Sequence, residues 1–203
     1  MNHKIEPKEI DTLFECLRAP LFYFITALFI FWGGSESPWP LALTIPFATA
    51  LCALTYIDMK HMILPDLITL PMIALGLILH FTFTGNLIIP LLGAVAGFVL
   101  FFLIFYISYK IKGEPGMGFG DVKFLAMLGS WVGLSGLPLI LLYASMFALL
   151  YILLKIIFNQ YIKSQAFPFG PFLAIGGWFA FLYHDASWRV IVDLRQSLIN
   201  IIG

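Results

Sequence analysis

The sequence predicts an all-α, polytopic helical membrane protein with about seven transmembrane spans. Hydrophobic residues make up 61% of the 203-residue chain, and charged residues make up only 11%. The mean hydropathy is +0.98, which is typical of a membrane protein and not of a soluble domain. Apolar segments recur from near the beginning to near the end of the chain, so the membrane helices themselves form the fold.

Seven apolar segments follow one another, separated by turns rich in glycine, proline and serine. We expect spans at residues 20–32, 39–57, 67–83, 87–109, 122–134, 139–158 and 169–183. Residues 1–19 are then an N-terminal cytoplasmic or interfacial segment, and residues 20–184 are the transmembrane core. Residues 185–203 form an amphipathic tail, which we expect to be a helix lying at the membrane interface.

The positions of lysine and arginine set the expected orientation. In a seven-span arrangement, the loops of one side contain lysines or arginines, whereas the turns at 33–38, 84–86 and 135–138 contain none. By the positive-inside rule, the N-terminus is cytoplasmic and the C-terminus is outside. The segments around residues 58 and 121 then share the cytoplasmic side of a multi-pass protein.

Charge and cysteine usage argue against several classes of partner. The formal net charge is zero, so nothing favours nucleic acid as a partner. Cys16 and Cys52 form no C-x-x-C pair, and the four histidines show no ligand spacing, so we expect no metal and no cofactor. Residues 1–18 lack the basic, apolar and small-residue pattern of a cleavable secretory signal. Membrane lipid is the expected surrounding.

Two aspartates stand at the edges of apolar segments. Asp58 closes the segment 39–57, and Asp121 follows the glycine-rich sequence GMGFG at 116–120. A carboxylate in such a place is costly and indicates a functional site by default. Two carboxylates close together share a proton, so one can activate water while the other protonates a leaving nitrogen. The pair is therefore a candidate for hydrolysing a peptide bond.

Six neighbouring residues are candidates for binding substrate or shaping the site: Gly118, Gly120, Lys123, Lys60, Pro65 and Asp66. The glycines permit a tight turn and the close approach of a substrate strand. Lys123 would neutralise charge beside the aspartates or hold a substrate carboxylate. Structural roles remain open as well: Asp121 suits the N-cap of the helix that follows, Asp58 and Asp66 suit solvated interfacial caps, and Lys60 suits a topological anchor.

Taken together, these residues resemble the type IV prepilin peptidase family, the bacterial members of the GxGD aspartyl proteases. Three stretches carry the resemblance, in the family's order: YIDMKHMILPDLITLP at 56–71, GMGFGDVKF at 116–124 and PFGPFL at 168–173. The resemblance implies that Asp58 and Asp121 are the catalytic pair. It also implies removal of the short basic leader of type IV prepilins or pseudopilins, after a glycine, at the cytoplasmic face of the bacterial inner membrane.

Many members of that family carry paired C-x-x-C motifs before the peptidase core, associated with methylation of the new N-terminus. Since this sequence has no such pair, we expect a peptidase without N-methyltransferase activity, S-adenosylmethionine or zinc. The alternatives are a small proton- or cation-coupled transporter that uses intramembrane carboxylates, a presenilin-like protease, and a non-catalytic factor that binds pilin helices. The lack of an internal repeat disfavours the transporter, and the PFGPFL stretch disfavours the presenilin type.

Overall fold

The computed structural model describes residues 26–27, 41–114, 116–158 and 168–202. Within these ranges the regular structure is entirely helical, as expected. The helices are α3 (Leu41–His61), α4 (Asp66–Thr84), α5 (Ile88–Lys112), α6 (Phe119–Val132), α7 (Gly136–Ile157) and α8 (Gly170–Ile202). The predicted N-terminal segment, most of the span at 20–32 and the loop at 159–167 lie outside the described residues.

Three helices in the described ranges, α4, α5 and α7, are long and apolar enough to cross a membrane. They coincide closely with the segments predicted at 67–83, 87–109 and 139–158. Large apolar side chains cover their outer surfaces and are exposed, as expected for helices that face lipid. The structure therefore gives a helical protein with three candidate spans, and the total of about seven stays a prediction.

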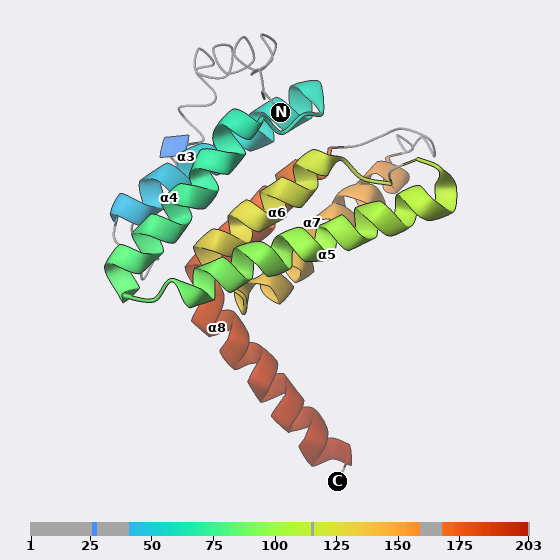
Figure 1. Cartoon of the computed structure of the whole chain (residues 1–203). Helices are drawn as coiled ribbons and strands as arrows, with labels where there is room; N and C mark the ends of the chain where they lie inside the picture. Colours follow the sequence, from blue (N-terminus) through green and yellow to red (C-terminus); the bar gives the residue numbers. More distant parts are fainter. Residues whose placement is uncertain (1–25, 28–40, 115, 159–167, 203) are drawn as a thin grey trace.

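Helix α6 forms the centre of the bundle. It has only 14 residues, and its side chains from Val122 to Trp131 are buried except for that of Lys123, which is partly exposed. It packs against α4, α5, α7 and α8, and Figure 1 shows it between α4 and α5. A helix that is apolar on every side is stable only in such surroundings.

Glycines let α5 and α6 approach each other backbone to backbone. A Cβ atom on Gly93 would lie 2.2 Å from the Gly129 carbonyl oxygen, and one on Gly97 would lie 2.7 Å from the Leu125 carbonyl oxygen. Gly93 and Gly97 are four residues apart and so share one face of α5. This spacing of small residues is a common way to bring two membrane helices into close contact.

An aromatic cluster joins α3, α6 and α8. The ring of Trp131 on α6 stacks on that of Phe47 on α3, with 4.7 Å between the centroids. Phe47 also contacts Phe181 on α8 at 4.9 Å, and Trp178 is completely buried beside it. The indole N–H of Trp131 donates to the Met72 carbonyl oxygen at 2.8 Å, which ties α4 to the same cluster.

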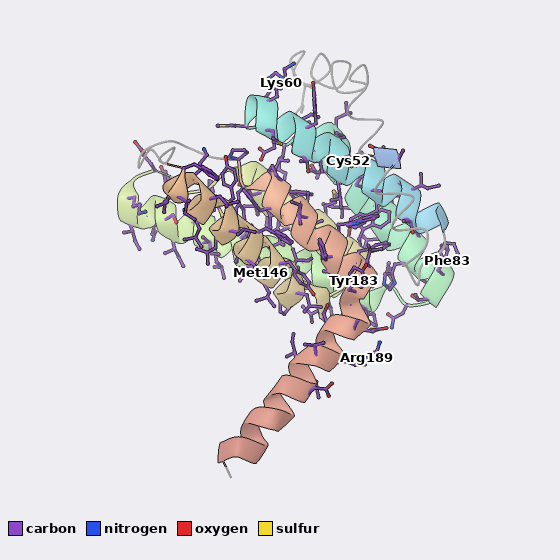
Figure 2. All side chains as sticks on the ribbon, turned by 180° about the vertical axis from the view of Figure 1, so that it is seen from behind. Cys52, Lys60, Phe83, Met146, Tyr183 and Arg189 are labelled. Carbon is purple, nitrogen blue, oxygen red and sulfur yellow. The ribbon has the colours of Figure 1, made fainter. Side chains whose placement is uncertain are left out.

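Helix α8 bends at Tyr183, whose backbone angles (φ −114°, ψ 25°) leave the helical region. Beyond the bend, its C-terminal half extends away from the other helices (Figure 1). Figure 2 labels Tyr183 at the bend and Arg189 on the extending part. The predicted tail is thus helical to Ile202 and continuous with α8, while its place at a membrane interface stays a prediction.

Candidate functional site

Asp58 and Asp121 come from helices that end and begin in the same region of the bundle. Helix α3 continues to His61, so Asp58 lies in its last turn and not in the segment that follows the helix. Asp121 lies in the first turn of α6. The negative charge of Asp58 raises the pKa of Asp121, so the fold places the two carboxylates that the sequence singles out within electrostatic range of each other. Both lie outside the three candidate spans.

Asp58 is a buried carboxylate with a backbone donor. Its residue is only 5% exposed, and its Oδ2 atom accepts a hydrogen bond of 2.9 Å from the backbone N–H of Gly170. Burial raises the pKa of Asp58 above its ordinary value because it disfavours the charged form, while the Gly170 hydrogen bond acts in the opposite direction. The surroundings of Asp58 therefore disfavour its ionised form, and the Gly170 N–H is the donor that stabilises that form.

Asp121 is partly buried, and two effects raise its pKa. Burial, together with the nearby charge of Asp58, raises the pKa of Asp121 to about 6, although a backbone hydrogen bond from Gly118 opposes the shift. A carboxyl group with such a pKa exchanges its proton close to neutral pH. That property suits a group that donates and accepts protons in a reaction.

The N-cap role considered for Asp121 is wrong. Helix α6 begins at Phe119, so Gly118 is the N-cap residue and Asp121 is the third helical residue. The backbone N–H of Asp121 donates to the Gly118 carbonyl oxygen at 3.2 Å. Because the chain enters the helix three residues earlier than the apolar pattern indicates, the carboxylate of Asp121 is placed about one half-turn inside α6.

The glycines before Asp121 matter because they lack a side chain, and not because they adopt unusual backbone angles. Gly118 has φ −70° and ψ 143°, an extended conformation open to any residue. Gly120 is different, because a Cβ atom there would lie 3.0 Å from the Leu64 Cβ atom. Among the described residues of this connection, the positive φ angle belongs to Gly113, at 74°. Gly120 therefore lets the start of α6 approach the segment that links α3 to α4.

Lys123 pairs with Asp66. The Nζ atom of Lys123 lies 2.6 Å from both carboxylate oxygens of Asp66, and the two side chains are only 20% and 15% exposed. Asp66 is the first residue of α4, and the buried Pro65 is its N-cap residue, as expected for a helix start. The ion pair joins the N-terminal ends of α4 and α6, so Lys123 reaches a carboxylate of the protein itself.

Lys60 lies apart from this pair. It is exposed in the last turn of α3, and Figure 2 shows it at the outer end of that helix. The position suits the topological anchor considered for it.

Gly118 is also exposed, and a Cβ atom there would lie 3.5 Å from Oδ2 of Asp121. Gly118 is thus the candidate glycine that lies directly against an aspartate carboxylate.

Gly170 is the residue of this site that sequence reasoning missed. It begins α8, and a Cβ atom there would lie 2.6 Å from Oδ2 of Asp58. Only glycine leaves room for the carboxylate at this distance. Its position in the PFGPFL stretch at 168–173 was the available signal, but the pairing depends on α3 and α8 meeting in the fold.

A cavity of about 600 Å³ lies at the opposite end of α6 from Asp121, and neither aspartate lines it. At its edge, Oγ of Ser135 lies 2.9 Å from Nε2 of His184, whose Nδ1 lies 3.0 Å from Oδ1 of Asp185. The order resembles a hydrolase triad, but the Asp185 side chain is 87% exposed. A triad needs a buried carboxylate to orient its histidine, so we place the candidate site at Asp58 and Asp121.

In the described ranges, no group of three or more His, Cys, Asp or Glu side chains is placed so that it could hold a metal ion. The groups available at the site are instead the two carboxylates, the Gly170 and Gly118 N–H groups and the Asp66–Lys123 ion pair. The two carboxylates can move protons, while the Gly170 N–H and Lys123 are engaged with Asp58 and Asp66.

The match to a family model and the matches to curated relatives indicate the same protein family. Residues 45–153 match the model of the type IV leader peptidase family. The "Prepilin leader peptidase/N-methyltransferase" of Aeromonas salmonicida is 36% identical over 178 residues, which cover 85% of this chain and 60% of the relative. The proteins of the same name from Pseudomonas aeruginosa and Neisseria gonorrhoeae are 36% and 39% identical, and the matches cover 87% and 70% of this chain.

The chain spans about 60% of the length of the first of these curated relatives, and 62% and 48% of the other two. No solved structure matches it.

Proposed function

The chain belongs to the type IV leader peptidase family, and from that premise we propose that it is a membrane-embedded aspartyl endopeptidase acting on type IV prepilins or pseudopilins. The observation that carries the proposal is that Asp58 lies near enough to Asp121 for its charge to raise the pKa of Asp121. A buried and a partly buried carboxylate whose charges repel each other bind one proton more readily than two isolated ones. Such a pair contains both the base and the acid that amide hydrolysis needs.

The proposed reaction uses water as the nucleophile. The ionised aspartate takes a proton from water while the oxygen attacks the peptide carbonyl carbon, and the protonated aspartate gives its proton to the carbonyl oxygen. The resulting diol then returns one hydroxyl proton to the second aspartate. The first aspartate passes its proton to the leaving nitrogen, and the carbon–nitrogen bond breaks. The pair thereby returns to its starting state, with one proton bound.

The proposed substrate is the short basic leader of a prepilin, cut after a glycine with the apolar substrate helix lying in the bilayer beside the enzyme. This places the aspartates at the cytoplasmic face of the bacterial inner membrane, in an arrangement of about seven spans. The lysine distribution supports this orientation, and the three candidate spans support membrane insertion. Because the chain matches only part of each relative's length, the proposal concerns the peptidase activity alone.

Co-expression with a prepilin tests the proposal. The wild-type protein should shorten the prepilin by its leader, whereas Asp58→Asn and Asp121→Asn should each leave it at full length. Asp185→Asn is a matched control, because this aspartate is exposed near the other end of the bundle, and it should process as wild type does. The amount of each variant in the membrane is measured in parallel. Processing by either of the first two variants would exclude the paired mechanism.

A further inference from the structure

The two aspartates are held by unequal surroundings. Asp58 lies in the last turn of α3, where the carbonyl end of a helix disfavours a negative charge. Its Oδ2 atom, however, faces the beginning of α8 and accepts the Gly170 N–H at 2.9 Å. The first N–H groups of a helix have no partner within the helix and favour an anion. The end of α3 therefore disfavours the Asp58 anion, whereas the first N–H group of α8 stabilises it.

The contact between Gly170 and Asp58 requires the absence of a side chain at position 170. Gly170 is buried, and a Cβ atom at this position would lie 2.6 Å from Oδ2, 3.0 Å from Cγ and 3.3 Å from Cβ of Asp58. The side chain of Asp58 thus occupies the space that any other residue at 170 would fill. The contact also spans 112 positions in the chain, so it exists only when α3 and α8 have their final arrangement.

We propose that Gly170 is a positioning residue that makes Asp58 the ionised, water-activating member of the pair and leaves Asp121 as the first proton donor. This inference rests on the proposed peptidase function and adds to it a division of roles. In the addition step, Asp58 takes the proton of the attacking water and Asp121 protonates the carbonyl oxygen. In the collapse step, Asp121 recovers a proton from the diol, and Asp58 protonates the leaving nitrogen.

The charges around the pair agree with this division. In the described ranges, the charged and histidine side chains toward this end of the bundle are Lys60 and His61 on α3, Asp66 on α4, Lys110, Lys112 and Glu114 at and after the end of α5, Asp121 and Lys123 on α6, and Lys155 at the end of α7. Helix α8 has no charged or histidine side chain before His184, so its contribution here is the Gly170 N–H. The charge on Asp58 raises the pKa of Asp121, as expected if Asp58 is the first of the two to ionise.

The pH profile of prepilin cleavage by the full chain in detergent or membranes tests the role of Gly170. In wild type, the acid limb reports ionisation of Asp58 and the alkaline limb reports ionisation of Asp121. Gly170→Ala should displace the Asp58 carboxylate from its donor, so the acid limb should rise by about one pH unit. The alkaline limb should move less. Equal limbs in wild type and variant would overturn the proposal.

Gly177→Ala is the matched control. It lies on the same helix, and its Cβ atom would meet Leu128 Cδ2 at 2.5 Å, away from any carboxylate. It should reduce stability as Gly170→Ala does, but it should keep the wild-type pH limbs. A shift of the acid limb in Gly177→Ala would show that loosened packing alone moves the profile, and the role assigned to Gly170 would fall.

A second measurement does not depend on the folding of Gly170→Ala. Carboxyl infrared or ¹³C NMR titration of the wild-type protein gives the order in which the two aspartates ionise, with bands assigned by their loss in Asp58→Asn or Asp121→Asn. The proposal requires Asp58 to ionise at the lower pH, and the reverse order would overturn it. If wild type fails to cleave any prepilin, the proposed function fails instead, while the titration order is still measured.

Discussion

Lys123 and Asp66 form a close ion pair, with the ammonium nitrogen 2.6 Å from both carboxylate oxygens. The pair joins the fifth residue of α6 to the first residue of α4. Because Asp121 lies two residues before Lys123 in α6, the ion pair also restrains the backbone that carries a proposed catalytic group. Its contribution is therefore expected to appear in both stability and cleavage.

Breaking this ion pair should destabilise the protein without abolishing cleavage. Both side chains are largely shielded from water, so Lys123→Met leaves a poorly solvated carboxylate, and Asp66→Asn leaves a poorly solvated ammonium group. Each variant should lose about 1–3 kcal/mol of stability. Unfolding by denaturant in micelles measures the loss, and prepilin processing should be slowed in both variants.

The double variant separates pairing from other effects. Asp66→Asn combined with Lys123→Met should cost less than the sum of the two single changes, with a coupling of about 1–2 kcal/mol. Strict additivity would show that the two side chains stabilise the fold independently. Complete loss of processing in a well-folded Asp66→Asn variant would instead place Asp66 in the reaction itself.

Replacing Asp121 should stabilise the protein at neutral pH. Its pKa in the folded protein is about 6, above the ordinary value of 3.8, so the folded state binds the proton more tightly than the unfolded state does. The favourable contribution is complete below about pH 4 and is lost as the pH rises through 6. A shift of about two pH units corresponds to about 3 kcal/mol.

Asp121→Asn should therefore be more stable than wild type at pH 8 by up to about 3 kcal/mol, and the difference should vanish near pH 3.5. Denaturant unfolding across this pH range measures it. Asp185→Asn, at a side chain that is 87% exposed, is the control and should follow wild type. A constant difference at all pH values would mean that the gain has a cause other than ionisation.

The contact between α5 and α6 should not tolerate a methyl group. In Gly93→Ala, the new Cβ atom would lie 2.2 Å from a backbone carbonyl oxygen of α6, which cannot move aside as a side chain can. Separating the two helices should cost at least about 1–3 kcal/mol. Val95→Ala is the matched control, since that side chain is 52% exposed on the same helix and should have little effect. Thermal unfolding in micelles compares the two variants.

The helices could be predicted from sequence because apolar segments and turn residues are local signals. Pro65 and Asp66 begin α4 as expected, whereas α5 continues to Lys112, three residues beyond the predicted end of its apolar segment at residue 109. The early start of α6 at Phe119 was not predicted, since a phenylalanine between two glycines resembles a turn. The helical tail at 185–203 was predicted from its amphipathic spacing, whereas its joining to the segment at 169–183 in a single helix α8 that bends at Tyr183 was not.

The site was predictable only in part, for a physical reason. Costly carboxylates at the edges of apolar segments singled out Asp58 and Asp121 one at a time, and their meeting followed from counting spans. The partners of these residues depend on which helices are neighbours. Asp66 as the partner of Lys123, and Gly170 as the donor to Asp58, are contacts between segments far apart in sequence, and no local pattern specifies them.

The shortness of α6 has a consequence for the surrounding lipid. Fourteen residues rise about 21 Å along a helix axis, whereas the hydrocarbon layer is about 30 Å thick. Where the longer neighbours of α6 reach from one headgroup region to the other, at least one end of α6 stops short of it. Polar backbone at that depth is tolerated only against protein or water. Since neighbouring helices surround the sides of α6, we expect the short end at Asp121 to be reached by a small inlet of solvent, which would supply the water that hydrolysis consumes.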